Sequence, residues 1–413
     1  MATSFISFRG IIICAIAALF CSYQFMLQGA PSVMVPQLMS AFDLDVADIG
    51  GLTSSFLCFY LLFQVPGGYL ADRCNARLLL VICCVLMAAG CYWFSISETL
   101  LSASASRAFM GVMTSPVIVV CMNLASRWFP ERYFPTLAGA IESFGLAGGG
   151  LGPLILPNLM EAYGWQGAMQ AAAIFGVVLA VLIALFVKSS PPVSVSDAKL
   201  HEVTCGGDAD INRSEKVPFD LASLILCCLY GFGLFAVITS FAGLWGIPFF
   251  YQRFPQEQEA VADMVALMFV GAAIGAPLLG WLASLAGSMR KVMVVCAIAS
   301  PVLFSLLIFC PCSMSVMAVI CFMAGISSVG YMLAFSVVKS ISPPQRIGVM
   351  LAITNGSMLL AGPVLQLMIG FILEGIGDDG LGSLTIHDYQ LAFIPLLLCQ
   401  LMALVVAVYL KKQ

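Results

Sequence analysis

The chain carries a short charged segment between two long apolar runs: GYLADRCNAR at residues 68–77. A less complete copy follows Gly280, where Ser284 occupies the position of Asp72 and the basic pair Arg290-Lys291 comes after it. The apolar runs are roughly 20 residues long, which is the length of helix that crosses about 30 Å of hydrocarbon. We therefore interpret residues 68–77 as a turn between two membrane-spanning helices, in a chain built from two related halves.

The amino-acid composition is typical of a membrane protein. Of the 413 residues, 61% are hydrophobic and 9% are charged, whereas a soluble domain has about 25% charged residues. Most of the 16 cysteines lie in apolar runs, where cysteine behaves as a small apolar residue. His201 and His387 fall in predicted loops, so neither a metal site nor a cofactor is expected. A nucleic-acid partner is not expected either.

Twelve apolar runs predict twelve helical spans, because a backbone in lipid must satisfy its hydrogen bonds within its own segment. In the first half they cover residues 10–34, 49–70, 78–97, 101–126, 134–158 and 167–188. In the second half they cover residues 219–248, 261–285, 291–311, 314–338, 347–373 and 390–410. The first run is longer than a signal-peptide core and lacks a cleavage site, so we interpret it as the first span.

Basic residues gather in the loops on one side of these spans. With the N-terminus inside, all but two of the 17 lysines and arginines fall on the inner side. The exceptions are Arg253, in an outer loop, and Arg107, within a span. This positive-inside distribution predicts a multi-pass protein with both termini in the cytoplasm.

Residues 189–218 interrupt the apolar pattern with proline, glycine and mixed charges, and are predicted to form a flexible cytoplasmic linker. The linker separates an N-terminal bundle of six helices, residues 1–188, from a C-terminal bundle of six, residues 219–413. Parallel repeats around a central cavity are typical of transporters. Three pairs of short segments, separated by nearly the same number of residues, support a duplication. They are Leu27–Pro31 with Leu244–Pro248, at the ends of spans one and seven, Gly68 with Gly280, and Gly152-Pro153 with Gly362-Pro363.

The charged segment matches the pattern Gly-x-Leu-Ala-Asp-Arg, with a later basic residue at Arg77. It resembles the loop between the second and third spans of the major facilitator superfamily, and the likeness covers essentially the whole chain. The resemblance implies an all-α membrane fold of twelve transmembrane helices in two pseudo-symmetric six-helix bundles, and secondary active transport by alternating access. The gating residues that it implies are Gly68, Asp72, Arg73 and Arg77.

In that family, the aspartate of the motif caps a helix of the other half. Here the expected partner of Asp72 is the positive N-terminus of the eleventh span. Asn75 replaces the usual glycine, and asparagine tolerates the left-handed backbone of a tight turn. Because Ser284 replaces the acid in the second copy, we expect the two copies to hold the halves together unequally. A simpler interpretation, that these charges only anchor the loop inside, stays open.

Arg107 and Glu142 lie within predicted spans, where a charge costs at least about 2.5–3.5 kcal/mol and usually faces a cavity or a partner. Arg107 and Gly111 resemble the superfamily's Arg-x-x-Gln-Gly motif, which implies binding of a substrate carboxylate or a part in proton coupling. A tie between helices is the alternative. Glu142 is predicted to carry a proton, because low-dielectric surroundings favour the neutral acid, or else to hydrogen-bond in a helix interface. Their depths differ by roughly ten residues, so a direct ion pair is not expected.

Polar and aromatic residues within spans outline the predicted substrate cavity. Gln24 and Gln28 are one helical turn apart and share a face, whereas Asn355 and Gln366 are about three turns apart and also align. For each such residue, a hydrogen bond between helices is the alternative to a binding role. Together with Arg107, the predicted substrate-binding residues are Tyr23, Gln24, Gln28, Tyr230, Trp245, Tyr331, Asn355 and Gln366.

A closer likeness rests on YQFMLQGAPSVM at 23–34, QVPGG at 64–68, RWFP at 127–130 and GLWGIP at 243–248. These segments resemble bacterial phagosomal nutrient transporters and organic-anion symporters. The resemblance implies a monomer in the bacterial inner membrane that takes up an amino acid, a nucleoside or an organic acid with protons. Export of a metabolite, siderophore or drug is the alternative, because glycines of span five partly match a pattern of proton-coupled exporters. A sensor would need an output domain larger than the linker, and an enzyme would need a cluster of catalytic side chains that the sequence does not offer.

Overall fold

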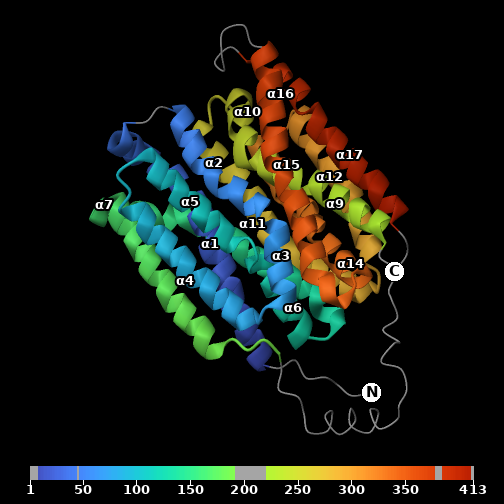
Figure 1. The fold of residues 1–413 in the computed structure, drawn as a ribbon. Helices are drawn as coiled ribbons and strands as arrows, with labels where there is room; N and C mark the ends of the chain where they lie inside the picture. The colour runs from blue at the N-terminus through green and yellow to red at the C-terminus, as the bar shows by residue number, and fades with distance from the viewer. Residues whose placement is uncertain (1–7, 44–45, 191–219, 377–383, 411–413) are drawn as a thin grey trace, which may run out of the picture.

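The computed structural model of the protein describes residues 8–43, 46–190, 220–376 and 384–410. In these ranges the regular secondary structure is helical throughout (Figure 1). The predicted linker 189–218 lies outside the described residues except for Ser189 and Ser190. The helices of the N-terminal half are α1 (Phe8–Phe42), α2 (Val46–Leu62), α3 (Gln64–Arg73), α4 (Ala76–Ser95), α5 (Leu100–Thr114), α6 (Val117–Trp128), the 3-10 turn η1 (Glu131–Tyr133) and α7 (Phe134–Phe186).

The C-terminal half repeats this plan with more irregular turns inside its helices. Span seven contains a π-helical stretch, and span ten contains a 3-10 turn. The elements are α9 (Leu221–Ala236), η2 (Val237–Trp245), α10 (Gly246–Arg253), α11 (Gln258–Ala286), α12 (Met289–Phe309), α13 (Met314–Ser328), η3 (Val329–Met332), α14 (Leu333–Ile341), η4 (Pro344–Arg346), α15 (Ile347–Ile376), α16 (Ile386–Ala392) and α17 (Ile394–Tyr409).

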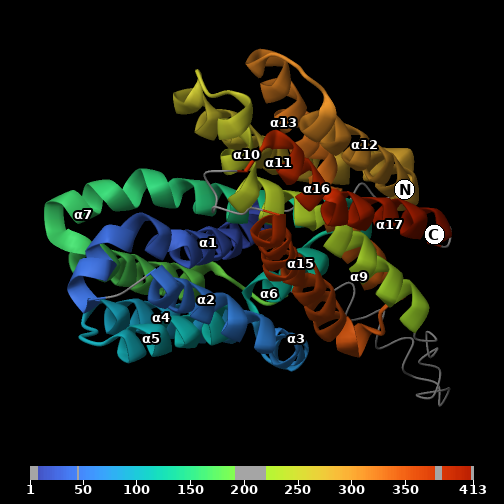
Figure 2. The same ribbon diagram turned by 90° about the horizontal axis from the view of Figure 1, so that it is seen from above.

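Twelve spans can be followed through the described ranges. Ten helical stretches are long and apolar enough to cross a membrane, and the pair α2–α3, bent by 47°, adds one more. Within α7 the backbone of Gly164 leaves the helical region at φ 71° and ψ 172°. This break divides α7 into two spans, which fold back on each other at the left of Figure 2. The prediction of an all-α membrane protein is confirmed.

The prediction that span one ends near residue 34 is wrong. The helix α1 continues through Pro31 and Pro36 to Phe42. A proline usually breaks a helix because it leaves the carbonyl four residues earlier without a donor. Here the carbonyl of Leu27 accepts a hydrogen bond from Arg107 Nη1 instead, at 2.6 Å. The helix of span seven likewise extends past Pro248 to Arg253, through α10.

Asn75 also differs from its expected conformation. Its φ of −64° and ψ of 120° are extended rather than left-handed, and its side chain accepts a hydrogen bond from the backbone N–H of Leu78. Asparagine is one of the preferred residues for capping a helix N-terminus in this way. Asn75 therefore caps α4, and the first two residues of that helix, Ala76 and Arg77, complete the charged segment.

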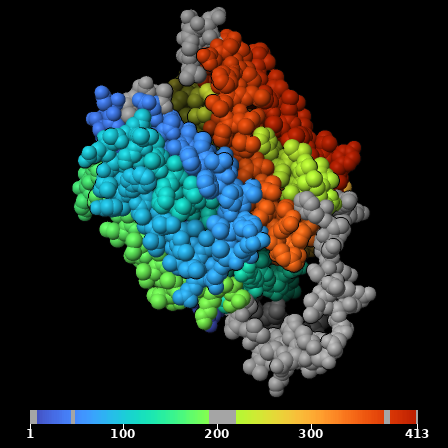
Figure 3. All heavy atoms as spheres, in the orientation of Figure 1, coloured from blue at the N-terminus to red at the C-terminus, as the bar shows by residue number. Residues whose placement is uncertain are grey.

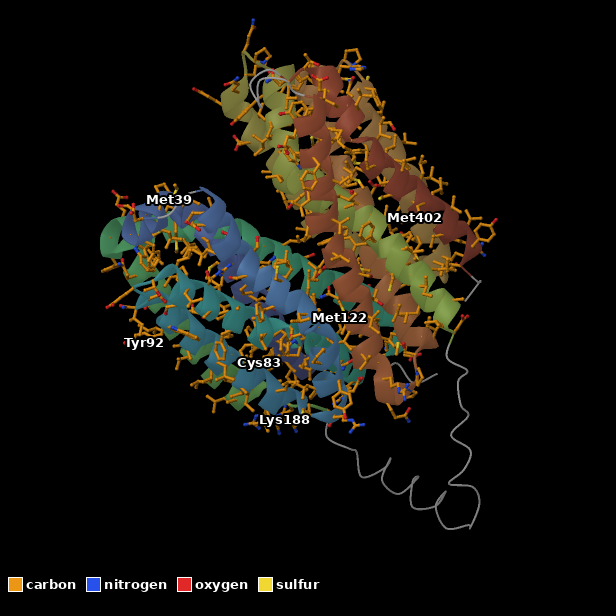
Figure 4. The ribbon with its side chains drawn as sticks, turned by 45° about the horizontal axis from the view of Figure 1, so that its top comes forward. Met39, Cys83, Tyr92, Met122, Lys188 and Met402 are labelled. Atoms are coloured by element: carbon orange, nitrogen blue, oxygen red, sulfur yellow. The ribbon has the colours of Figure 1, made fainter. Side chains whose placement is uncertain are left out.

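The two halves touch at one end and separate at the other. In Figure 4 they meet near Met122 and diverge toward the end that carries Met39. Figure 3 shows α15, in orange, running along the border beside α2 and α3, in blue. The end at which the halves meet is the one where the charged segment lies. On the outside of both halves, large apolar side chains such as Leu154 and Phe371 are exposed, as lipid-facing residues are.

Candidate functional site

The halves meet along two related lines of contact, which we call the seam: α3 against the start of α15, and the start of α7 against α11. At Gly68 a Cβ atom would stand 2.6 Å from Gly348 O and 2.6 Å from Ala352 Cβ. At Gly280, the matching glycine of the second half, a Cβ would collide with the backbone of Pro135. Both repeated glycines thus permit backbone-to-backbone approach between halves, which is how helices pack closely in a membrane.

Asp72 lies at the end of the seam where α15 begins. Its carboxylate accepts hydrogen bonds from the backbone N–H groups of Gly348, at 2.5 Å, and Val349, at 3.0 Å. These are two of the free N–H groups at the N-terminus of α15, where a negative charge is favoured by the helix dipole. Ser284, at the equivalent place in the second half, donates one hydrogen bond to the carbonyl of Arg132 at 2.7 Å. The two lines of the seam therefore differ in charge and in the number of hydrogen bonds.

The contacts of Arg73 and Arg77, the other two residues of the predicted gating set, lie outside the seam. The guanidinium of Arg73 lies over the ring of Tyr69, with its Cζ atom 4.4 Å from the ring centroid. The backbone N–H of Arg77 donates to Ser189 Oγ at 3.3 Å. Neither contact crosses the seam.

Ser143 adds a cross-half hydrogen bond closer to the middle of the membrane. It donates to the carbonyl of Ala273 in α11 at 2.5 Å. That carbonyl lies four residues before Pro277, which cannot supply the helical N–H it would otherwise receive. A helix break in one half thus provides the acceptor that binds the other half.

A cavity lies above the seam, between the two halves. Its enclosed volume is about 10 Å³, and the empty space that includes the part continuous with solvent is about 320 Å³. Apolar walls come from Phe25, Ile118, Phe235, Met358 and Leu359. Its polar lining comes from both halves. The N-terminal half supplies Gln24, Gln28, Tyr60 and Glu142, and the C-terminal half supplies Tyr331 and Asn355.

Glu142 and Tyr331 join the halves inside this cavity. The Tyr331 hydroxyl donates a hydrogen bond to Glu142 Oε1 at 2.8 Å. Glu142 is only 5% exposed and Tyr331 2%. The second carboxyl oxygen, Glu142 Oε2, has no hydrogen-bond partner among the described residues, and the same is true of Gln24 Oε1. This cavity therefore contains two buried acceptor atoms without a hydrogen-bond donor among the described residues, an unusual state for buried polar groups.

Tyr60 and Gln64 belong to the same polar cluster, although the sequence interpretation did not assign them to the site. The side-chain amide of Asn355 in α15 lies 3.2 Å from Tyr60 Oη and 3.3 Å from Gln64 Oε1, across the boundary between halves. Tyr60 and Gln64 are four residues apart, and two polar residues at that spacing in an apolar span are the signal that could have identified them.

Arg107 lies beside the cavity but not in its lining. It is fully buried, and its guanidinium donates to the carbonyls of Leu27 and Gln28 at 2.6 and 2.9 Å. Its Cζ atom is 4.8 Å from the centroid of the Phe56 ring. Among the described residues no ion pair joins it to Glu142, in keeping with their predicted difference in depth. The geometry matches the alternative interpretation of Arg107, a tie between helices.

The remaining predicted residues hydrogen-bond to backbone within their own half. Tyr23 donates to the carbonyl of Ala172 at 2.8 Å, and Tyr230 donates to that of Met293 at 3.2 Å. Trp245 Nε1 donates to Gln366 O at 3.1 Å. In return Gln366 Nε2 donates at 2.8 Å to a carbonyl of the π-helical stretch η2, that of Thr239. The lining of the cavity includes none of these four side chains.

Comparison with known proteins gives one family. The family model of the Major Facilitator Superfamily matches residues 14–410. A D-galactonate transporter of Escherichia coli O6:H1 is 25% identical over 386 residues, which cover 84% of this chain and 85% of that protein. The outward conformation of the transporter FucP superposes with a TM-score of 0.70 at 16% identity, over 98% of this chain and all of FucP. The proton:xylose symporter XylE gives a TM-score of 0.73 at 13% identity, over 99% of this chain and 97% of XylE.

The chain therefore belongs to the major facilitator superfamily. It is a multi-pass membrane transporter for a small molecule, and not an enzyme. The fold expected from the charged segment is that of its structural neighbours.

Proposed function

We propose that this protein takes up a small polar solute across the bacterial inner membrane together with protons, as a monomer working by alternating access. The observation that carries the proposal is the hydrogen bond between Tyr331 and Glu142, at 2.8 Å in the central cavity. It is the place where an ionisable group, the solute cavity and the boundary between halves coincide. An ionisable residue inside a membrane protein is by default a candidate for function.

Protonation of Glu142 acts directly on this link. As a carboxylate, Glu142 accepts a charge-assisted hydrogen bond, which is roughly twice as strong as a neutral one. Adding a proton removes that assistance and also removes the cost of a buried charge. The neutral acid therefore holds Tyr331 less tightly, and the halves are freer to move relative to each other. Proton binding and the conformational change are coupled through this one contact.

The seam supplies the other part of alternating access. In this structure the cross-half hydrogen bonds of the described residues lie between the cavity and the charged segment. Opening the cavity toward that end requires breaking them. The basic residues of the same end support a cytoplasmic orientation for the termini by the positive-inside rule. The cavity of this structure then faces the outside, which is the state that receives a solute for uptake.

The experiment compares wild type with Glu142→Gln in proteoliposomes that contain a pH-sensitive dye. The solute is taken from a thermal-shift panel of sugar acids, hexitols, amino acids and nucleosides. Wild type is expected to move protons with the solute and to accumulate it under an imposed pH gradient. Glutamine imitates the neutral acid, so the variant should exchange solute between the two sides but lose accumulation.

Glu161→Gln is the matched control, because it makes the same change at an exposed position of the same helix element α7. It is expected to behave as wild type. Solute-induced proton movement that persists at the wild-type rate in Glu142→Gln would remove Glu142 as the proton carrier. Accumulation only in vesicles of reversed orientation would favour export over uptake.

A further inference from the structure

The cavity carries one ionisable group capable of charge near neutral pH, and that group is an acid. Besides Glu142, its polar lining consists of the amides Gln24, Gln28 and Asn355 and the phenols Tyr60 and Tyr331. Among the described residues that line it, none is lysine, arginine or histidine. A negatively charged solute would meet a like charge here and no cation.

The nearest buried cation is already engaged. Arg107 directs Nη1 and Nη2 at the carbonyls of Leu27 and Gln28, on the α1 backbone behind the cavity wall. The Leu27 carbonyl is the one that Pro31 leaves without a helical donor. Turning Arg107 toward a solute would leave this buried carbonyl unpaired, which proteins avoid.

Two unpartnered atoms of the cavity lining are hydrogen-bond acceptors, whereas the unpartnered donors nearby, Gln64 Nε2 and Arg107 Nε, belong to residues outside the lining. Glu142 Oε2 and Gln24 Oε1 are buried without hydrogen-bond partners among the described residues. Their residues are 5% and 1% exposed. A carboxylate has no hydrogen to offer them, whereas a hydroxyl or an ammonium group does. The amides and phenols around them can both donate and accept, which suits a solute with several hydroxyl groups.

We infer that the central cavity binds a polyhydroxylated solute without negative charge, which places a hydroxyl or ammonium group against Glu142 and Gln24. This inference rests on the proposed function, because it names the solute class of the same cavity. It separates this chain from the sugar-acid transporter that it resembles, whose solute is D-galactonate.

The test uses three probes on one six-carbon skeleton: galactitol, 1-amino-1-deoxygalactitol and D-galactonate. They differ only at one terminal carbon, which is a hydroxymethyl, an ammoniomethyl or a carboxylate carbon. Binding to the purified wild-type transporter in lipid nanodiscs is measured by calorimetry and by thermal shift. Galactitol or the amino compound is expected to bind at least tenfold more tightly than galactonate. Tighter binding of galactonate overturns the inference, and so does absence of binding by all three.

A positive charge added to the cavity lining provides a second test of the solute class. Gln28→Arg places a cation in the cavity wall and should change the ratio of galactonate to amino-compound affinity at least tenfold in favour of galactonate. The matched control is Gln252→Arg, which adds the same charge at an exposed position of α10 and should leave the ratio unchanged. An unchanged ratio in Gln28→Arg, with wild-type thermal stability, means that the probes bind elsewhere.

Failure of this inference and failure of the proposed function give different results. If galactonate binds best and drives Glu142-dependent proton movement, the proposed function stands and the inference falls. If galactitol or the amino compound binds but moves no protons, the solute class stands and proton coupling falls.

Discussion

Replacing Asp72 by asparagine is expected to open the seam in front of α15 about 20 times more often than in wild type. The carboxylate holds two backbone N–H groups, those of Gly348 and Val349. Asparagine has nearly the same shape, but it keeps one acceptor oxygen and has no charge. The change therefore removes one charge-assisted hydrogen bond and the charge–dipole attraction, while packing is preserved.

The magnitude follows from these two losses. A hydrogen bond to a charged group contributes about 1.5–3 kcal/mol, and a charge at a helix N-terminus about 0.3–1 kcal/mol at exposed sites. Asp72 is half-buried, so we take the lower ends, which sum to about 1.8 kcal/mol. At about 1.4 kcal/mol per factor of ten, this corresponds to roughly 20-fold. In wild type the Ser284 hydroxyl also donates to Gly280 O within its own helix, and that bond remains when the bond to Arg132 breaks. The net contribution of Ser284 to closure is therefore small, and we expect Ser284→Ala to cost about 0.5 kcal/mol, or roughly twofold.

Hydrogen–deuterium exchange of the protein in nanodiscs measures both openings without added labels. Exchange of the first amides of α15 should rise by the predicted factor in Asp72→Asn, and that of α12, which is remote from the seam, should not. Ser284→Ala should change exchange only slightly in α11 and at the start of α7. Equal effects of the two variants, or unchanged exchange at 347–350 in Asp72→Asn, would refute the unequal seam.

Three further changes test separate parts of the structure. Gly139→Ala would drive a Cβ into the backbone of Ala276 and to 2.8 Å from Pro277 N, and overpacking of about 1–3 kcal/mol should raise exchange of α11 at the seam. Arg107→Lys loses the two-pronged guanidinium that holds two backbone carbonyls. It should lower the melting temperature and reduce transport of neutral and anionic solutes equally. A loss of transport confined to anions would assign Arg107 to solute binding. Tyr230→Phe removes the hydrogen bond to Met293 O and should cost about 1 kcal/mol of stability with the solute affinity unchanged, as measured by calorimetry.

The membrane topology of this chain can be predicted from short stretches of its sequence. Lipid requires long apolar helices and allows few charges, so apolar length and loop charge determine where spans lie. Repeated short matches then indicate two halves. The structure departs from those expectations at Pro31, because the partner that allows the helix to continue is Arg107, far away in the sequence.

The site is harder to predict for a related reason. Gln24, Gln28, Glu142, Tyr331 and Asn355 are polar residues in apolar spans, and the structure brings them to one cavity. Tyr23, Tyr230, Trp245 and Gln366 have the same signature, yet each bonds to backbone within its own half. Composition and periodicity do not distinguish a cavity wall from an interhelical contact, because both place polar atoms on an inward face. Which pairs meet across the halves depends on the conformational state, and a sequence encodes at least two of these.

The seam also has a consequence for how such a protein adapts. Several hydrogen bonds across it join a side chain of one half to main-chain atoms of the other: Asp72 binds Gly348 and Val349, and Ser143 binds Ala273. Main-chain atoms are the same for every residue except proline, which lacks the N–H. A saturation scan should therefore find that side-chain chemistry matters at Asp72 and Ser143, whereas opposite them only size and proline matter. A lineage could then retune the balance between its two conformations by single substitutions at the side-chain positions, without a compensating change in the other half. Two duplicated halves that recognise each other in this way can drift apart in sequence and still close.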